Sequence, residues 1–232
     1  MRLLLAISAG CAALATQSSA SELYFQDFST QGSGYSTSVS EFSDGGFDFF
    51  TQSDANSVNS SVNYNGADGA YFAGMDLDGE GASLPLTLTT SAFDISNATN
   101  LQFMIDLAED GSNDGNNDWD SSDSVAFEYQ VDGGGWVSIF SAVNSGDPFN
   151  SAAFVNGVQI TDTFSTFTAD LSGVTGSTME IRLVWQLNAG DEDLAIDNIT
   201  LSGTVAVVPL PPAAFAGLGL LAALGAHRKF KK

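Results

Sequence analysis

Apolar and polar side chains alternate along most of the chain between residues 21 and 203. The clearest run has apolar residues at every second position: Met179, Ile181, Leu183, Trp185 and Leu187. An alternation of period two places one face of a β-strand in a core and the other face in solvent. Two further runs of this kind cover residues 101–107 and 125–131, and no long stretch of residues 21–203 has the period of a helix. The pattern predicts an all-β domain.

Glycine-rich turns separate these runs, most clearly at residues 132–135, where one Asp is followed by three Gly. Such a turn between two strand patterns indicates a β-hairpin. The number and spacing of the strands favour an antiparallel jelly-roll β-sandwich. The only cysteine, Cys11, lies near the N-terminus. We therefore expect the sandwich to be held together by its apolar core, without disulfides.

One strand pattern is irregular. The apolar residues Leu194 and Ile196 fall on even positions, whereas Ile199 and Leu201 fall on odd ones. Regular alternation cannot change parity, so either a β-bulge lies at Asp197-Asn198 or the strand is buried on both faces. Both alternatives remain open from the sequence.

The N-terminal 20 residues have the pattern of a secretory signal peptide. One basic residue, Arg2, precedes an apolar stretch from Leu3 to Ala15. A signal peptidase prefers small residues at positions −3 and −1 before the cleaved bond. Ser18 and Ala20 meet this preference, and Ala13 and Ala15 do so as an alternative. We predict export, with cleavage after Ala20 or after Ala15.

The C-terminal segment, residues 204–232, combines prolines, an apolar run and a basic end. Residues 213–226 contain no charge, and four of the last five residues are Arg or Lys. A helix over this run would be about 21 Å long, which is short for a hydrocarbon core of ~30 Å. The basic end favours the cytoplasmic side. The sequence thus predicts a signal peptide (1–20), a β-sandwich (21–203) and a short transmembrane segment (204–232) that holds the sandwich outside the inner membrane.

The predicted sandwich is strongly acidic. All 28 Asp and Glu residues of the chain lie in residues 21–203, where Arg182 is the only basic residue. This charge repels phosphate backbones, so nucleic acid is excluded as a partner. Two interpretations remain, a solvated acidic surface adapted to saline water, or acids that bind Ca²⁺.

The C-terminal segment resembles the PEP-CTERM class of bacterial sorting signals in its VPLPA-CTERM variant. The resemblance rests on Val208, Pro209, Leu210 and Pro211, followed by the apolar run and the basic end; Pro212 stands where the family prefers Ala. It implies recognition by an exosortase-type sorting enzyme and a host that makes exopolysaccharide. The expected location is therefore the cell surface or the extracellular matrix of a bacterium.

The acidic domain more loosely resembles jelly-roll modules of the MAM and concanavalin-like type, which occur on cell surfaces and in carbohydrate-binding proteins. The resembling segments are residues 25–28, 69–76, 127–136 and 194–199. Such folds often hold a structural cation between the first and last strands. The resemblance implies Asp27, Asp76 and Asp197 as its ligands.

Calcium prefers six to eight oxygen ligands, and the segment from Asp76 to Glu80 places carboxylates on alternate positions of a glycine-containing loop. We therefore add Asp78 to the predicted ligands Asp27, Asp76 and Asp197. Trp119 lies in a polar loop, so we expect its indole to be exposed and able to stack on a sugar ring.

Catalytic groups are scarce. The only histidine, His227, lies beyond the apolar C-terminal run, which excludes a histidine triad within the sandwich. We therefore expect a non-catalytic surface or matrix protein that binds Ca²⁺ and an extracellular polysaccharide. The alternatives are a secreted glycan-active enzyme, with paired carboxylates, and a structural coat protein with no small ligand.

Overall fold

The computed structural model describes residues 18–53, 58, 62–110, 119–146 and 152–206. Most of the predicted signal peptide and most of the sorting segment, including its motif at residues 208–211, lie outside these residues and stay predictions. Residues Ala20–Thr204 form one compact unit; the other unit comprises the two chain ends. No described helix is long and apolar enough to cross a bilayer.

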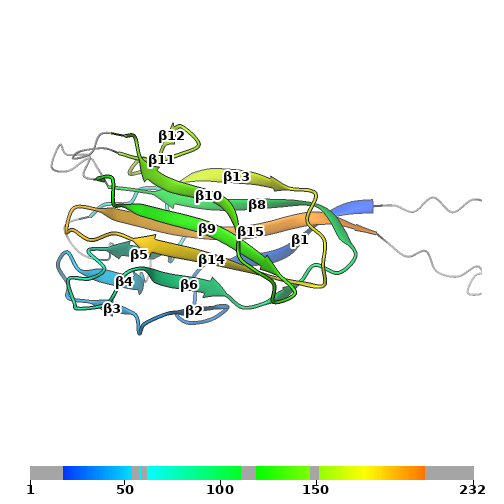
Figure 1. The fold of residues 1–232 in the computed structure, drawn as a ribbon, viewed down its shortest axis with the longest axis horizontal. Helices are drawn as coiled ribbons and strands as arrows, with labels where there is room; N and C mark the ends of the chain where they lie inside the picture. The colour runs from blue at the N-terminus through cyan, green and yellow to red at the C-terminus, as the bar shows by residue number, and fades with distance from the viewer. Residues whose placement is uncertain (1–17, 54–57, 59–61, 111–118, 147–151, 207–232) are drawn as a thin grey trace, which may run out of the picture. The chain divides into compact units, whose positions relative to one another are not determined.

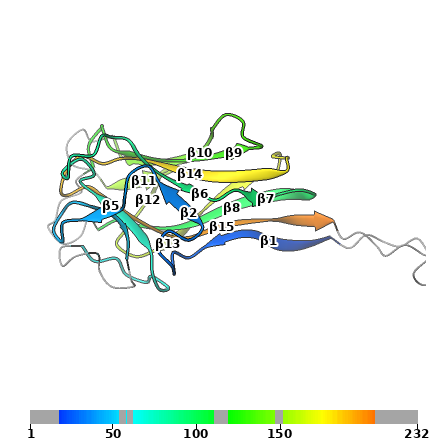
Figure 2. The ribbon, with the colours of Figure 1, turned by 90° about the horizontal axis from the view of Figure 1, so that it is seen from below.

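The described residues form two antiparallel sheets and contain no helix, which confirms the all-β prediction (Figure 1). The first sheet has the order β13 (Ser165–Leu171), β8 (Ala98–Ala108), β15 (Asp193–Ala206), β5 (Phe72–Met75), β4 (Phe49–Gln52) and β3 (Phe42–Ser43), and β1 (Ser18–Gln26) also pairs with β15. The second sheet has the order β12 (Val158–Gln159), β11 (Ala153–Val155), β10 (Val137–Asn144), β9 (Ser124–Val131), β14 (Thr178–Gln186), β6 (Leu86–Thr90) and β2 (Tyr35–Thr37), and β7 (Phe93–Asp94) pairs with β14. Figure 2 shows the two sheets as stacked layers.

The predicted alternation is visible along β14. The five apolar residues named above for this strand are each at most 1% exposed, whereas Glu180 and Arg182 are only half-buried. The predicted hairpin joins β9 to β10, and Asp132 and Gly133 adopt left-handed backbone conformations in its turn. The sequence pattern therefore locates both the strand faces and this connection correctly.

Aromatic side chains fill the space between the sheets. Phe72 of β5 lies among four other rings, with centroid distances of 4.8 Å to Phe50, 5.7 Å to Tyr35, 5.9 Å to Phe28 and 6.2 Å to Trp185. These rings come from both layers and are at most 5% exposed. Burial of aromatic surface in edge-to-face contacts stabilises the sandwich in the absence of disulfides.

The first five residues of β15, Asp193 to Asp197, are all buried. Leu194 and Ile196 face the space between the sheets. The opposite side of the strand is covered because the segment of residues 62–71 packs over it, through Val62 and Tyr71. At Asn198 the backbone is left-handed, with φ of 51°, and the alternation changes parity there. The structure thus shows the alternative of burial on both faces for residues 193–197, and the left-handed residue Asn198 accompanies the change of parity.

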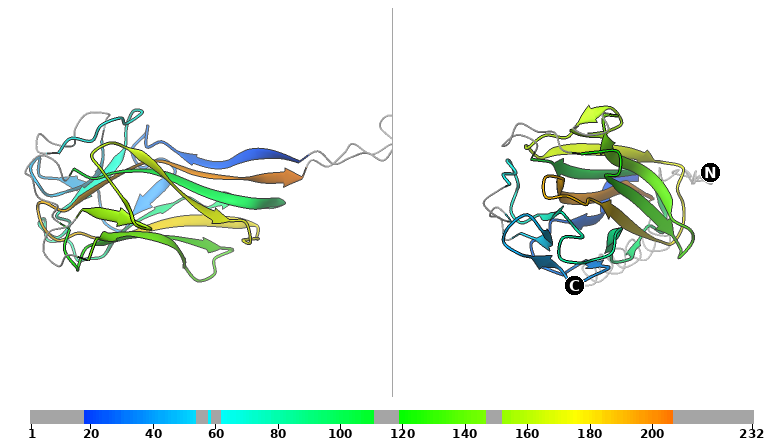
Figure 3. Two further views of the ribbon diagram at one scale, coloured as in Figure 1. Left: turned by 90° about the horizontal axis from the view of Figure 1, so that it is seen from above. Right: turned by 60° about the vertical axis from the view of Figure 1, so that its left-hand side comes forward.

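Four loops meet at the end of the sandwich where β15 begins. Met75 pairs with both Asp193 and Phe49, and Gln186 pairs with Ser124. This register brings together the loops of residues 44–48, 76–80, 119–123 and 187–192. The opposite end holds the start of β1 and the end of β15, which run side by side (Figure 3).

We expect the Phe72→Ala substitution to lower the free energy of unfolding by about 3–5 kcal/mol, because it removes the ring at the centre of the aromatic core. Phe25→Ala is the matched control, since Phe25 is 47% exposed on the neighbouring first strand. Its cost should stay below about 1 kcal/mol. Urea denaturation of both variants measures the difference, and equal costs would contradict the assignment of the core.

Candidate functional site

Carboxylates of the described residues gather in three groups. The central cluster is Asp27, Asp68, Asp106 and Asp197. The loop cluster is Asp44, Asp48, Asp76, Asp78 and Glu80. The end cluster is Asp120, Asp123 and Glu192. The loop cluster and the end cluster lie in the four loops where β15 begins, whereas the central cluster lies further along that strand.

Asp197 is the buried member of the central cluster and is 1% exposed. Its Oδ1 atom accepts a hydrogen bond of 2.7 Å from the backbone N–H of Asn198, whereas its Oδ2 atom receives no donor. Burial, and then the charges of Asp106, Asp27 and Asp68, raise its pKa to about 7. The charge of Asp27, at the end of the first predicted strand, thus acts on Asp197 in the last strand, and their joint binding of a cation stays a prediction.

Asp76 and Asp78 do not belong to that group. Residue 71 stands opposite Asp197 in the extended register of β5 and β15, so Asp76 lies about 16 Å further along the strands. Burial, and then the charges of Asp48 and Asp78, raise the pKa of Asp76 to about 6. The predicted ligand set is thus corrected: a single cation cannot contact both Asp76 and Asp197.

The loop cluster is largely exposed. The carboxylates of Asp44, Asp48 and Glu80 each offer an oxygen within 4.8 Å of the others, but Asp44 and Glu80 face solvent. Asp44 also accepts hydrogen bonds from the backbone N–H groups of Gly46, at 2.6 Å, and Asp48, at 3.2 Å. Asp44 therefore has a structural role, because its carboxylate stabilises the turn of residues 44–48.

The end cluster is the most buried of the three. Asp123 and Glu192 are each 3% exposed, and the three carboxylates offer oxygens within 4.8 Å of one another. Burial, and then the neighbouring carboxyl of Asp123, raise the pKa of Glu192. Nothing in the spacing of the sequence identifies this cluster, because its residues come from two loops about 70 positions apart.

Trp119 corrects the expectation of an exposed indole. Its side chain is fully buried, and its Nε1–H donates a hydrogen bond of 3.3 Å to the backbone oxygen of Asp193. A ring of this size packs between strands even when its sequence neighbours are polar, because burying it stabilises the fold. Trp119 therefore positions the loop of the end cluster and cannot stack on a sugar.

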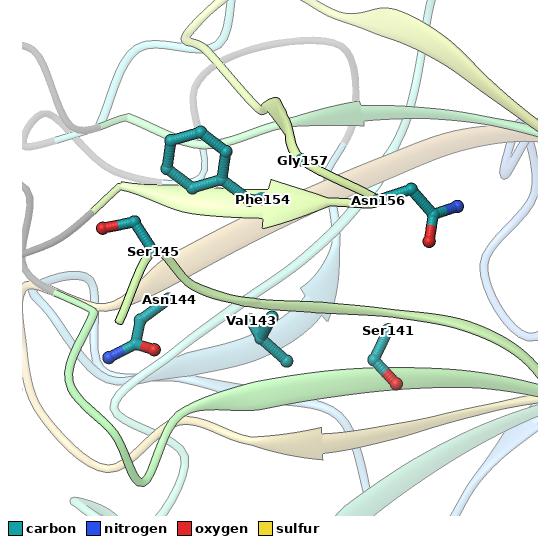
Figure 4. A pocket seen from close by; sticks show the side chains of 7 residues that line it. All are labelled: Ser141, Val143, Asn144, Ser145, Phe154, Asn156 and Gly157. Atoms are coloured by element: carbon teal, nitrogen blue, oxygen red, sulfur yellow. The ribbon is translucent and has the colours of Figure 1, made fainter. Parts of the chain in front are cut away.

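An open groove of about 540 Å³ lies on the second sheet, where β10 runs beside β11. Val143 and Phe154 stand opposite each other in the register and form its apolar part. Hydroxyl and amide groups complete the lining, so that the seven lining residues are Ser141, Val143, Asn144, Ser145, Phe154, Asn156 and Gly157 (Figure 4). The groove contains no ionisable side chain.

The same face of the second sheet carries Arg182. Its guanidinium forms a short ion pair with Glu128 and lies 4.2 Å from the ring centre of Trp136. Because Arg182 is the only basic residue of the domain, this pairing leaves the face without an uncompensated positive charge.

Comparisons with known proteins give structural neighbours but no family. No family model and no curated protein matches the chain. The K3 cleaved adhesin domain of Lys-gingipain from Porphyromonas gingivalis is similar, with a TM-score of 0.46 and 14% identity over 79% of this chain and 99% of that domain. The mannan-recognising module TmCBM27 has a TM-score of 0.41 and 15% identity over 80% of this chain and 98% of the module.

Without divalent cations, we expect the stability of the protein to fall as the pH rises through 7. The folded state raises the pKa of Asp197 from 3.8 to about 7. The resulting stabilisation is complete below pH 4 and is lost progressively between pH 4 and about 7, because in this range the folded state keeps a proton that the unfolded state has already released. Asp197→Asn mimics the protonated form and should flatten this part of the profile, whereas Glu22→Gln removes an exposed charge and should leave it unchanged. Melting temperatures at pH 5 and pH 8 in a chelator provide the measurement, and an unaltered profile in Asp197→Asn would refute the assignment.

Proposed function

We propose that the chain is a non-catalytic, exported glycan-binding domain, stabilised by Ca²⁺ and sorted to the cell surface or matrix through its C-terminal segment. The observation that carries the proposal is the groove between β10 and β11. It offers one aromatic ring, one aliphatic side chain and several hydroxyl and amide groups on a rigid sheet. Sugars combine apolar ring faces with hydroxyls, and such a lining can bind both.

The charge of the domain supports a neutral glycan. An anionic polysaccharide would approach a surface with many carboxylates and would meet only one guanidinium, which Glu128 already pairs. A neutral polysaccharide incurs no such repulsion. The groove lining adds no charge of its own, so hydrogen bonds and apolar contact would supply the affinity.

The burial of the paired carboxyls supports a non-catalytic role. Glycosidases need two carboxyl groups that reach the scissile bond. The loop cluster and the end cluster, whose carboxylate oxygens lie within 4.8 Å of one another, are both outside the groove lining, and in the end cluster Asp123 and Glu192 are each 3% exposed. Substrate cannot reach these carboxyls without an opening of the two loops that carry them.

Asp197 and Asp27 suit a structural cation. A buried carboxylate oxygen that receives no hydrogen bond is costly, and a bound Ca²⁺ would compensate it. Asp106 would contribute a further carboxylate, which Thr166 and Asn198 already orient by hydrogen bonds. In this arrangement the cation would tie the end of β1 to β15.

The groove is tested by the Phe154→Ala substitution. It removes the aromatic ring and should weaken binding to the recognised polysaccharide about tenfold or more, equivalent to about 1.4 kcal/mol. The control is Val158→Ala, which removes a side chain that is 59% exposed on the next strand but outside the groove. Affinity electrophoresis against neutral polysaccharides, with alginate as the anionic comparison, measures both variants. Retention of binding by Phe154→Ala, or binding to none of the polysaccharides, would argue against the proposal.

The sorting part of the proposal is tested separately in the producing bacterium. Replacing Pro209 and Pro211 by Ala, or deleting residues 228–232, should retain the protein in the inner membrane or change its processing. Both variants leave residues 21–203 intact, so glycan binding should be unchanged. Fractionation and immunoblotting report location and size, and normal sorting of both variants would exclude a role for the motif.

A further inference from the structure

The end cluster joins two loops that are distant in sequence. Asp120 and Asp123 close the turn before β9, where the N–H of Asp123 donates to the backbone oxygen of Asp120 over 3.3 Å. Glu192 ends the loop between β14 and β15. Its Oε2 atom accepts hydrogen bonds from the backbone N–H groups of Asn188, at 2.9 Å, and Ala189, at 3.0 Å. The carboxylate therefore points back into its own loop and toward the turn before β9.

Hydrogen bonds satisfy only part of this cluster. One oxygen of Asp123, Oδ2, accepts a hydrogen bond of 2.5 Å from the N–H of Asp120. The other oxygen, Oδ1, is buried and receives no donor, although the residue is only 3% exposed. Three carboxylates that share a buried space repel one another, and no basic side chain of the described residues pairs with them. A positive charge between them would compensate both the repulsion and the missing hydrogen bond.

Neutral oxygens surround the three carboxylates. The hydroxyl oxygen of Ser122 lies 2.6 Å from Asp120 Oδ1, to which it donates its one hydrogen, and 3.1 Å from Asn188 Oδ1. The side chains of Ser122 and Asn188 therefore lie beside the cluster and add oxygen atoms to it. The surroundings offer no thiolate and no imidazole, because the chain has only Cys11 and His227, outside this domain.

We propose that Asp120, Asp123 and Glu192 form a divalent-cation site that joins the turn before β9 to the loop between β14 and β15. An all-oxygen set of carboxylates, hydroxyl and amide groups suits Ca²⁺, which takes six to eight oxygen ligands in a flexible geometry. Zinc and copper favour nitrogen and sulfur ligands and fit this set less well. The site is separate from the central cluster, and it does not depend on glycan binding.

The cation would fix the start of β9. Ser124 follows Asp123 directly and pairs with Val143, which lines the groove. On the other side, Trp119 anchors the same turn to Asp193, the residue after Glu192. A bound cation would thus add a second link between the turn before β9 and the start of β15, beside the hydrogen bond from Trp119 to Asp193.

Terbium luminescence tests the site in the purified protein after treatment with a chelator. Tb³⁺ replaces Ca²⁺ at oxygen sites and is excited through a nearby indole, and Trp119 directly precedes Asp120. We expect indole-sensitised emission that Ca²⁺ displaces. Glu192→Gln and Asp123→Asn keep the side-chain oxygen that accepts the backbone hydrogen bonds but remove one negative charge. Each should lose most of this emission.

Asp197→Asn is the matched control, because it removes one buried carboxylate from the central cluster and leaves the end cluster unchanged. It should retain the emission. Saturating Ca²⁺ should raise the melting temperature of the wild type by about 5 °C or more above NaCl of equal ionic strength, and this control should lose only the part that the central cluster contributes. Added to Asp197→Asn, Glu192→Gln should remove the remaining increment while the protein still unfolds cooperatively in the chelator.

Two results would overturn the proposal. In the first, emission and the Ca²⁺ increment are unchanged in both Glu192→Gln and Asp123→Asn, which would place the cation elsewhere. In the second, Ca²⁺ acts no differently from NaCl on the wild type, and Glu192→Gln raises the melting temperature in the chelator. A proton shared between Asp123 and Glu192 would then hold the cluster together. The emission and melting-temperature measurements use no glycan, so a failure of the glycan-binding proposal would leave both results unchanged.

Discussion

Burial of β15 on both faces is the constraint on which the rest of the structure depends. The strand lies between β8 and β5, with β1 also paired to it, and the segment of residues 62–71 covers its outer side. This segment places Tyr64 over the strand, and its hydroxyl donates a hydrogen bond of 2.6 Å to Asp193. The backbone N–H of Asp110 donates to the same oxygen over 3.0 Å. A buried carboxylate is tolerated there because donors from two other segments converge on it.

The other buried acids in or near β15 accept hydrogen bonds from backbone N–H groups at only some of their carboxylate oxygens. Asp197 and the end cluster lie at the two ends of the covered part of the strand, and each retains a carboxylate oxygen without a hydrogen bond. A domain with many acids and one basic residue cannot compensate these charges with ion pairs. Protons, through the raised pKa values of Asp197 and Glu192, and cations from the medium are the two remaining sources of positive charge, which connects the composition of the chain to its candidate sites.

The sequence predicted the strands and the hairpin well, because alternation depends on local side chains and on one buried face. The burial of Trp185 also followed from this pattern, whereas the grouping of Asp27 with Asp197 was implied by the resemblance to jelly-roll modules. The burial of Trp119 did not follow from the pattern. It depends on a contact with Asp193, which lies 74 positions further along the chain. The separation of Asp76 from Asp197 likewise depends on the pairing register of β5 and β15. The end cluster arises only when two distant loops meet, and single-sequence patterns carry no information on such contacts.

The course of β1 and β15 side by side has a mechanical consequence. Because β15 ends at the side of the sandwich where β1 begins, a load on the C-terminal end of β15 acts along the strand axis. Hydrogen bonds in an antiparallel sheet are perpendicular to the strands. Such a pull therefore shears the bonds to the neighbouring strands together, rather than opening them one after another. An unprotected edge strand would peel at low force, whereas the long central strand of this sheet distributes the load over its whole length.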